Sequence, residues 1–140
     1  MKWANKFDHP TKKALLAEMD KEQGSLFDKA YQELADATGS SPSLTWMGLP
    51  WCWSYAYACP SSALIETVYL LPDPNSPKIA LSIRSTFFEQ NPPDTLHKAL
   101  HAGIASGVLI NHQTWCQWEI APPELLGPIV DLIRSACNPK

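Results

Sequence analysis

The sequence predicts an α+β protein in which an antiparallel sheet of four to five strands carries its helices on one face. Three observations predict this class. Two helical patterns precede a run of strand-like segments, and further helical patterns follow it. The strand-like segments are joined by short connections, which favour antiparallel hairpins over crossovers. Proline, at 13 of 140 residues, punctuates the chain between them. The expected element order is ααββββαβα.

Two helices are expected near the N-terminus. Residues 11–22 combine a few apolar residues with many charges, which is typical of an exposed helix. Gly24-Ser25 is expected to break it, with Ser25 as the N-cap of a second helix. The second helix, ending near residues 39–42, is amphipathic. Its apolar positions recur at helical spacing: Phe27, Ala30, Tyr31 and Leu34.

Four strand-like segments follow, at residues 43–47, 50–58, 64–71 and 78–85. The last alternates between apolar and polar side chains, so its two faces separate into Ile79, Leu81 and Ile83 against Lys78, Ser82 and Arg84. A helix is then expected from Asn91-Pro92-Pro93 to Gly107, and a further strand over residues 113–120. A final helix begins at Pro122-Pro123, and Gly127-Pro128 must kink or restart it.

Length, composition and charge bound the function. One hundred and forty residues, 45% of them hydrophobic, suit a single domain over residues 1–140 with a real core. No apolar run approaches the ~18 residues of a membrane span. A net charge of −3 argues against a partner nucleic acid held by a basic surface. The first residues contain no apolar signal-peptide region, so a cytosolic protein is expected. The four cysteines match no metal or redox spacing and are expected as free thiols.

Scattered motifs carry a family resemblance. They are His9-Pro10-Thr11 before a helix, Phe27-x-x-Ala30-Tyr31-x-x-Leu34, Trp51-x-Trp53-Ser54-Tyr55 and Trp115-x-x-Trp118-x-Ile120. In these the chain resembles the small bacterial cytosolic proteins known as domain of unknown function 3788. The resemblance covers most of the chain in element order. It implies an α+β fold and no activity, since the family offers no catalytic residues to carry over.

The segment at residues 50–58 is the most distinctive candidate site. On a strand, Trp51, Trp53, Tyr55 and Tyr57 share one face, and small residues share the other. Because small residues let helices approach a sheet closely, we expect the aromatic row to face away from the helices. Aromatic walls beside Arg84 and a second strand's row, either that of Trp115 or that of Trp118, would suit a flat polar ligand. The alternative is that these rings are core or a dimer face.

A metal or catalytic site is the competing interpretation. His97 and His101 lie four residues apart on an expected helix and would share a face. No carboxylate stands at a motif spacing beside them, and the sequence contains no nucleophile elbow and no phosphate-binding glycine motif. The commoner role for such histidines is at the boundary of an amphipathic helix.

The sequence therefore predicts a non-enzymatic domain that binds a small molecule on an aromatic sheet face. The residues expected to bind it are Trp51, Trp53, Tyr55, Arg84 and Trp115, and no metal or cofactor is expected. One alternative is a homodimer that uses the same face as its interface. Another is an enzyme for a small metabolite, or a metal-binding protein, that uses His97 and His101.

Overall fold

A computed structural model describes residues 7, 9–48, 52–59, 62–74, 76–121 and 123–137. Its strands form one antiparallel sheet of six, in the order β1-β2-β3-β4-β6-β5. The strands are β1 (Ser43–Trp46), β2 (Trp53–Ala58), β3 (Ile65–Leu71), β4 (Lys78–Arg84), β5 (Val108–Ile110) and β6 (Gln113–Glu119). The helices are α1 (Lys12–Ala17), α2 (Lys21–Thr38), α3 (Ser85–Gln90), α4 (His101–Ala105) and α5 (Leu126–Cys137).

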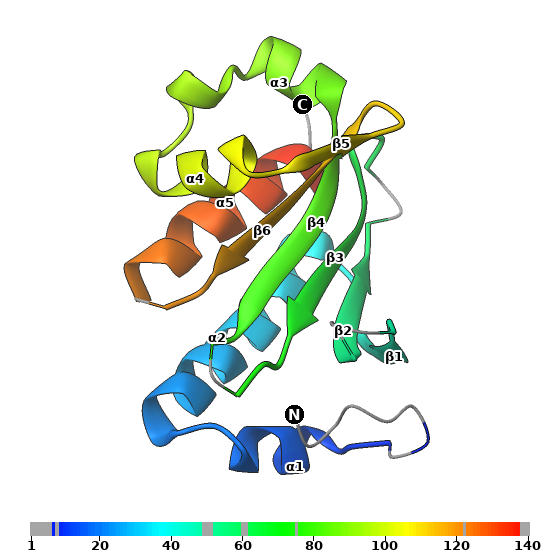
Figure 1. Cartoon of the computed structure of the whole chain (residues 1–140), viewed down its shortest axis with the longest axis vertical. Helices are drawn as coiled ribbons and strands as arrows, with labels where there is room; N and C mark the ends of the chain where they lie inside the picture. Colours follow the sequence, from blue (N-terminus) through cyan, green and yellow to red (C-terminus); the bar gives the residue numbers. More distant parts are fainter. Residues whose placement is uncertain are drawn as a thin grey trace.

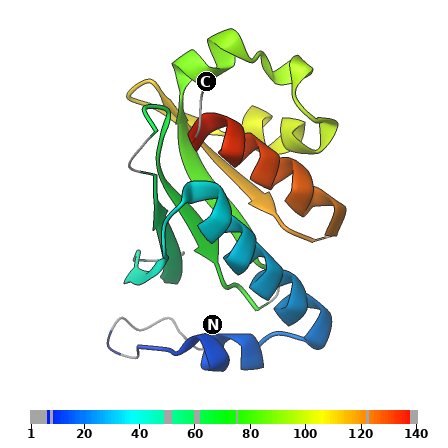
Figure 2. The ribbon, with the colours of Figure 1, turned by 180° about the vertical axis from the view of Figure 1, so that it is seen from behind.

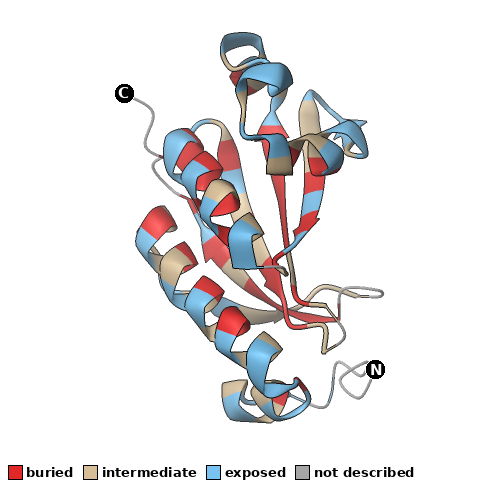
Figure 3. Ribbon diagram, turned by 90° about the vertical axis from the view of Figure 1, so that its left-hand side faces the viewer, coloured by how far each residue is buried: buried red, intermediate tan, exposed pale blue. Residues whose placement is uncertain are grey.

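The helices gather on one side of the sheet, which confirms the predicted α+β class. Figure 2 shows α2 and α5 side by side across one face, whereas in Figure 1 the strands lie in front of them. Among the described residues, no helix crosses the opposite face. In Figure 3 the buried stripes of the two long helices face the sheet, as amphipathic helices require. One face of the sheet is therefore core, and the other is open.

The sheet has six strands rather than four or five, because the short edge strand β5 was not predicted. It pairs with β6 through a two-residue turn in which Asn111 and His112 both have positive φ, 50° and 63°. This conformation matches the twist of a hairpin and is tolerated best by glycine and asparagine. The second turn residue is His112 instead of the glycine that usually follows asparagine in such turns, so the sequence did not indicate a hairpin here. With β5 and the separate helix α3, the observed order of helices and strands becomes ααββββααββα.

The predicted start of α2 is wrong. Its N-cap is Asp20, whose carboxylate accepts a hydrogen bond from the Gln23 N–H at 2.7 Å, and Ser25 lies inside the helix. A carboxylate suits this position because it also interacts favourably with the helix dipole. A glycine within a helix costs about 1 kcal/mol relative to alanine. The buried stripe that includes Phe27, Ala30 and Leu34 outweighs that cost. The helix ends as predicted, at Gly39, in the left-handed conformation.

The single helix predicted between residues 91 and 107 is broken into two 3₁₀ turns, Pro93–Thr95 and Lys98–Leu100, followed by α4. Leu96 and His97 between the turns have extended backbone, with ψ of 165° and 137°. Close packing fixes α4, because a Cβ at Gly103 would overlap the indole ring of Trp118. The Nε1 of the same ring donates a hydrogen bond to the Leu100 carbonyl at 3.1 Å. The contact with β6 thus decides where this helix lies.

At the C-terminal end, Gly127-Pro128 restarts the helix as predicted. A 3₁₀ turn, Pro123–Leu125, leads into α5, and Pro128 falls in the first turn of α5. Proline is tolerated there because the first N–H groups of a helix have no partner within the helix. Pro122 lies outside the described residues.

The register of the sheet assigns the core. Tyr55 on β2, Leu70 on β3, Ile79 on β4 and Trp118 on β6 are consecutive cross-strand partners. All four are buried, at 6% exposure or less, and belong to one hydrophobic cluster with α2 and α5. Ile79, Leu81 and Ile83 share this inner face, as the alternation on β4 predicts.

Candidate functional site

The open face of the sheet is hollowed where β3, β4 and β6 lie side by side. On this face Tyr69 of β3 is opposite Ala80, and Trp115 of β6 is opposite Ser82. Since β4 contributes only these two small side chains here, the larger rings on the flanking strands meet above it. Tyr69 and Trp115 stack, with their centroids 6.5 Å apart and their planes inclined by 24°. Both side chains are half-buried.

Two adjoining hollows extend from this ring pair. The smaller, of about 230 Å³, is lined by Tyr69, Trp115 and Ser82 together with Glu66, Thr67 and Gln113. The larger, of about 650 Å³, shares the last three of these residues. It continues past Arg84 to the chain that joins β2 to β3. We call the two together the open-face groove. Its combined size lies within the range of small-molecule sites, about 300–1,000 Å³.

The groove holds opposite charges that are not engaged with each other. Arg84 is the last residue of β4 and is exposed, and Glu66 is an exposed residue of β3. Within the described part of the chain, no side chain forms a hydrogen bond or ion pair with the Arg84 guanidinium or the Glu66 carboxylate. Both groups are therefore available to a ligand, one for an anion and one for a hydrogen-bond donor.

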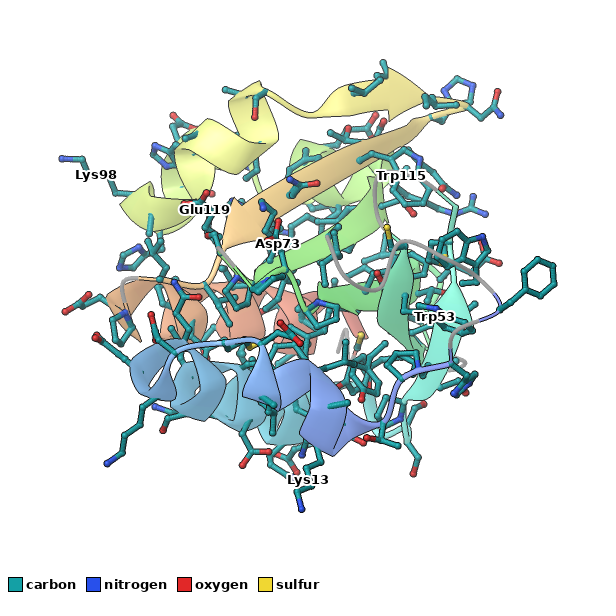
Figure 4. All side chains as sticks on the ribbon, turned by 60° about the horizontal axis from the view of Figure 1, so that its bottom comes forward. Lys13, Trp53, Asp73, Lys98, Trp115 and Glu119 are labelled. Atoms are coloured by element: carbon teal, nitrogen blue, oxygen red, sulfur yellow. The ribbon has the colours of Figure 1, made fainter. Side chains whose placement is uncertain are left out.

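The structure separates the predicted site residues. Arg84 and Trp115 lie in the groove, but Trp53 and Tyr55 lie on the opposite, inner face. Figure 4 labels Trp53 on β2 and Trp115 on β6, apart from each other. Trp51 lies outside the described residues. We expected the aromatic row to face away from the helices, and this is wrong for its described members, Trp53, Tyr55 and Tyr57. Large rings gain more free energy from burial than the small side chains on the other face do, so the aromatic face is the one that is covered.

The inner rings are tied into the core by specific contacts. Tyr55 packs edge-on against Tyr31 of α2, with centroids 5.0 Å apart, and burial raises the pKa of Tyr55 to about 12. The Tyr57 hydroxyl donates a hydrogen bond to the Tyr31 carbonyl at 3.0 Å. Trp53 meets His9 edge-on at 4.6 Å between centroids. Tyr55 and Tyr57 thus stabilise the joint between α2 and β2, whereas Trp53 packs against His9, before α1. None of the three lines the groove.

Sequence reasoning missed Tyr69, Thr67, Glu66 and Gln113 as groove residues. The segment at residues 64–71 was recognised as a strand, but a strand that is apolar on both sides gives no sign of which residues face out. Only the register shows that Tyr69 is beside Ala80 and near Trp115. The useful signal is the pair of small residues, Ala80 and Ser82, between strands that carry large rings.

The alternative site at His97 and His101 required both residues to share one helix, and the structure places them on different elements. His97 lies before a 3₁₀ turn, where its Nδ1 accepts a hydrogen bond from the Ala99 N–H at 3.0 Å. His101 begins α4, and its Nε2 is 3.1 Å from the Leu96 carbonyl oxygen. Each ring is thus engaged with the backbone. The described residues contain no cluster of three or more side chains able to ligate a metal.

Comparisons with known proteins add no identification, since no family model, no curated protein and no solved structure matches this chain. The resemblance to domain of unknown function 3788 therefore stays a prediction from the sequence. Among the described helices, none has the length and apolar character needed to cross a bilayer.

Proposed function

We propose that the chain is a binding protein whose open-face groove holds a small, flat molecule carrying an anionic group. The observation that supports this most is the position of the stacked Tyr69–Trp115 pair in a groove that also contains the uncommitted Arg84 guanidinium. The groove offers no paired acid and base and no activated nucleophile among the residues that line it, so binding without catalysis is the simplest function for it.

Each part of such a ligand has a matching partner. A planar ring would lie against the aromatic pair, because offset stacking on tyrosine and tryptophan is favourable. A phosphate or carboxylate would reach Arg84, whose planar guanidinium binds two oxygens at once. The ring's hydrogen-bonding groups would meet Glu66, Thr67 and Gln113 on the intervening surface. A nucleotide, or a flat aromatic acid, fits this pattern better than a neutral sugar does.

The proposal is tested by comparing charged ligands with their neutral analogues. The probes are adenosine monophosphate against adenosine, and indole-3-acetate against its amide. Tryptophan fluorescence and titration calorimetry report binding, since Trp115 lines the groove. We expect the anion of at least one pair to bind about 10-fold or more tightly than its neutral analogue, because a charge-assisted hydrogen bond contributes about 1.5–3 kcal/mol. If neither anion binds at millimolar concentration, the proposal is wrong.

Two variants assign the binding to the groove. Arg84→Gln is expected to remove the preference for the anion while leaving the weaker binding of the neutral analogue unchanged. Lys98→Gln is the matched control, because it removes one positive charge from an exposed position that Figure 4 shows well away from Trp115. Equal loss of anion binding in both variants would indicate a general effect of net charge and would contradict a specific role for Arg84.

A second candidate function, homodimer formation, is favoured by the edge strand β5. Val108, Leu109 and Ile110 are 59%, 66% and 51% exposed, and β5 pairs with β6 along only one of its edges among the described strands. An exposed apolar edge strand favours pairing with another strand. Light scattering is expected to give twice the mass of 15.6 kDa. Leu109→Lys should restore the monomer, whereas Ala105→Lys, outside the strand, should not. A wild-type monomer at high concentration contradicts this candidate.

A further inference from the structure

Cys59 and Cys137 place two thiols in direct contact across the interior. The sulfur atoms are 3.2 Å apart, although the residues are separated by 78 positions in the sequence. Cys59 directly follows β2, and Cys137 is the last residue of α5. Both residues are only 4% exposed. Neither forms a disulfide in this structure.

Hydrogen bonds hold the backbone next to both cysteines. The Ser62 hydroxyl donates to the Ala136 carbonyl at 2.7 Å and accepts from the Leu64 and Ile65 N–H groups, each at 3.0 Å. Ser62 lies three residues after Cys59, and Ala136 directly precedes Cys137. This serine therefore fixes the chain after β2 to the end of α5. The close approach of the sulfurs is set by anchored backbone on both sides.

Cys59 lines the larger hollow of the open-face groove, so a small oxidant would approach the pair from that side. The buried Cys116 is not part of this sulfur–sulfur contact, and burial raises its pKa to about 11. The hydrogen bond with Cys59 lowers the pKa of Cys137, whereas that bond and burial raise the pKa of Cys59. The contact thus favours ionisation of Cys137 before that of Cys59.

We propose that Cys59 and Cys137 form a reversible intramolecular disulfide when the protein meets a hydroperoxide. A disulfide has sulfur atoms about 2.05 Å apart, so the two sulfurs need to move only about 1.2 Å closer to form the bond. The disulfide needs no ligand in the groove, although Cys59 also lines the larger hollow. It gives the fold a covalent link between the sheet and α5 that depends on oxidation.

The reaction balances with hydrogen peroxide as the oxidant. The thiolate of the pair attacks one peroxide oxygen, the O–O bond breaks, and a sulfenic acid forms with release of hydroxide, which takes up the proton that this thiol lost and becomes water. The second sulfur then attacks the sulfenic sulfur, the S–O bond breaks, and the S–S bond forms with release of a second water. Two thiols lose two electrons in total, the peroxide gains them, and both thiol protons end in water. A dithiol reductant reverses the change by thiol–disulfide exchange.

Mass spectrometry of the full chain tests the proposal. The reduced protein is treated with a small excess of hydrogen peroxide, and its mass is expected to fall by about 2 Da, as one disulfide requires. Digestion without reduction should yield one linked peptide containing Cys59 and Cys137, and dithiothreitol should restore the original mass. The Tm should rise by roughly 5–15 °C on oxidation, since the link closes a long loop. No loss of mass, or a linked peptide with any other cysteine, would overturn the proposal.

Variants distinguish the pair from general oxidation. Cys137→Ser is expected to abolish the mass loss, because the second sulfur of the disulfide is absent. Cys116→Ser is the matched control: it replaces another buried cysteine and should still lose about 2 Da. The linked-peptide assay on the wild-type chain decides the question even if a serine at either position of the pair prevents folding.

Discussion

Tyr55 and Tyr57 are residues whose chemistry is controlled by burial. Their rings occupy the joint between β2 and α2, beside Tyr31, and both side chains are almost inaccessible to water. Ionising either phenol would place a negative charge where water cannot solvate it, so burial raises both pKa values, that of Tyr55 to about 12. At the scale of single residues, the core is thus sensitive to strongly alkaline conditions.

The sign of this effect follows from linkage. Below the ordinary tyrosine pKa of 10.0 both folded and unfolded chains keep the phenol protonated. Between pH 10 and 12 only the unfolded chain loses the Tyr55 proton, so the free energy of unfolding falls as pH rises through this window. Tyr55→Phe should flatten the fall. Urea unfolding between pH 8 and 11.5 measures it. A difference between variant and wild type that is constant with pH would contradict the assignment.

At the scale of elements, the start of α2 offers the clearest test. Asp20→Ala removes the carboxylate that accepts the Gln23 N–H, and it should lower the free energy of unfolding by about 1 kcal/mol. Ser25→Ala is the matched control. Ser25 is exposed inside the helix, where alanine is the better helix former, so this change should be neutral or slightly stabilising. The reverse order of effects in urea unfolding would move the helix start to Ser25.

The elements that were predicted well are those in which apolar residues repeat several times at helix or strand spacing. The apolar spacing of α2 and the alternation of β4 each span several repeats, so their faces, the bounds of β4 and the end of α2 were predictable. The three-residue strand β5 has no period to detect. The breaks before α4 depend on the fit of Gly103 against Trp118, a contact between residues 15 apart in the sequence. Local pattern carries no information about such contacts.

At the scale of the whole molecule, the side on which the helices lie decides the site. The alternation at β2 defines two faces, one aromatic and one small, but does not say which is covered. The structure covers the aromatic face, which sends Tyr55 to the core and leaves Arg84 and Trp115 on the open face. Two of the five residues predicted to bind a ligand, Arg84 and Trp115, therefore lie in the groove. The groove residues on β3 could be identified only from the register of the sheet.

The strand order also affects the sequence of events during folding. Strands β1 to β4 are neighbours in the sheet in the order in which they occur in the chain, so hairpins joined by short turns can assemble them. Strand β6 instead pairs with β4 across the long segment that contains α3 and α4, and closing this longer loop costs more conformational entropy. We therefore expect the meander to form early in folding and the β5–β6 hairpin to dock late. Because β6 supplies Trp115, the groove would be completed only in the final stage of folding.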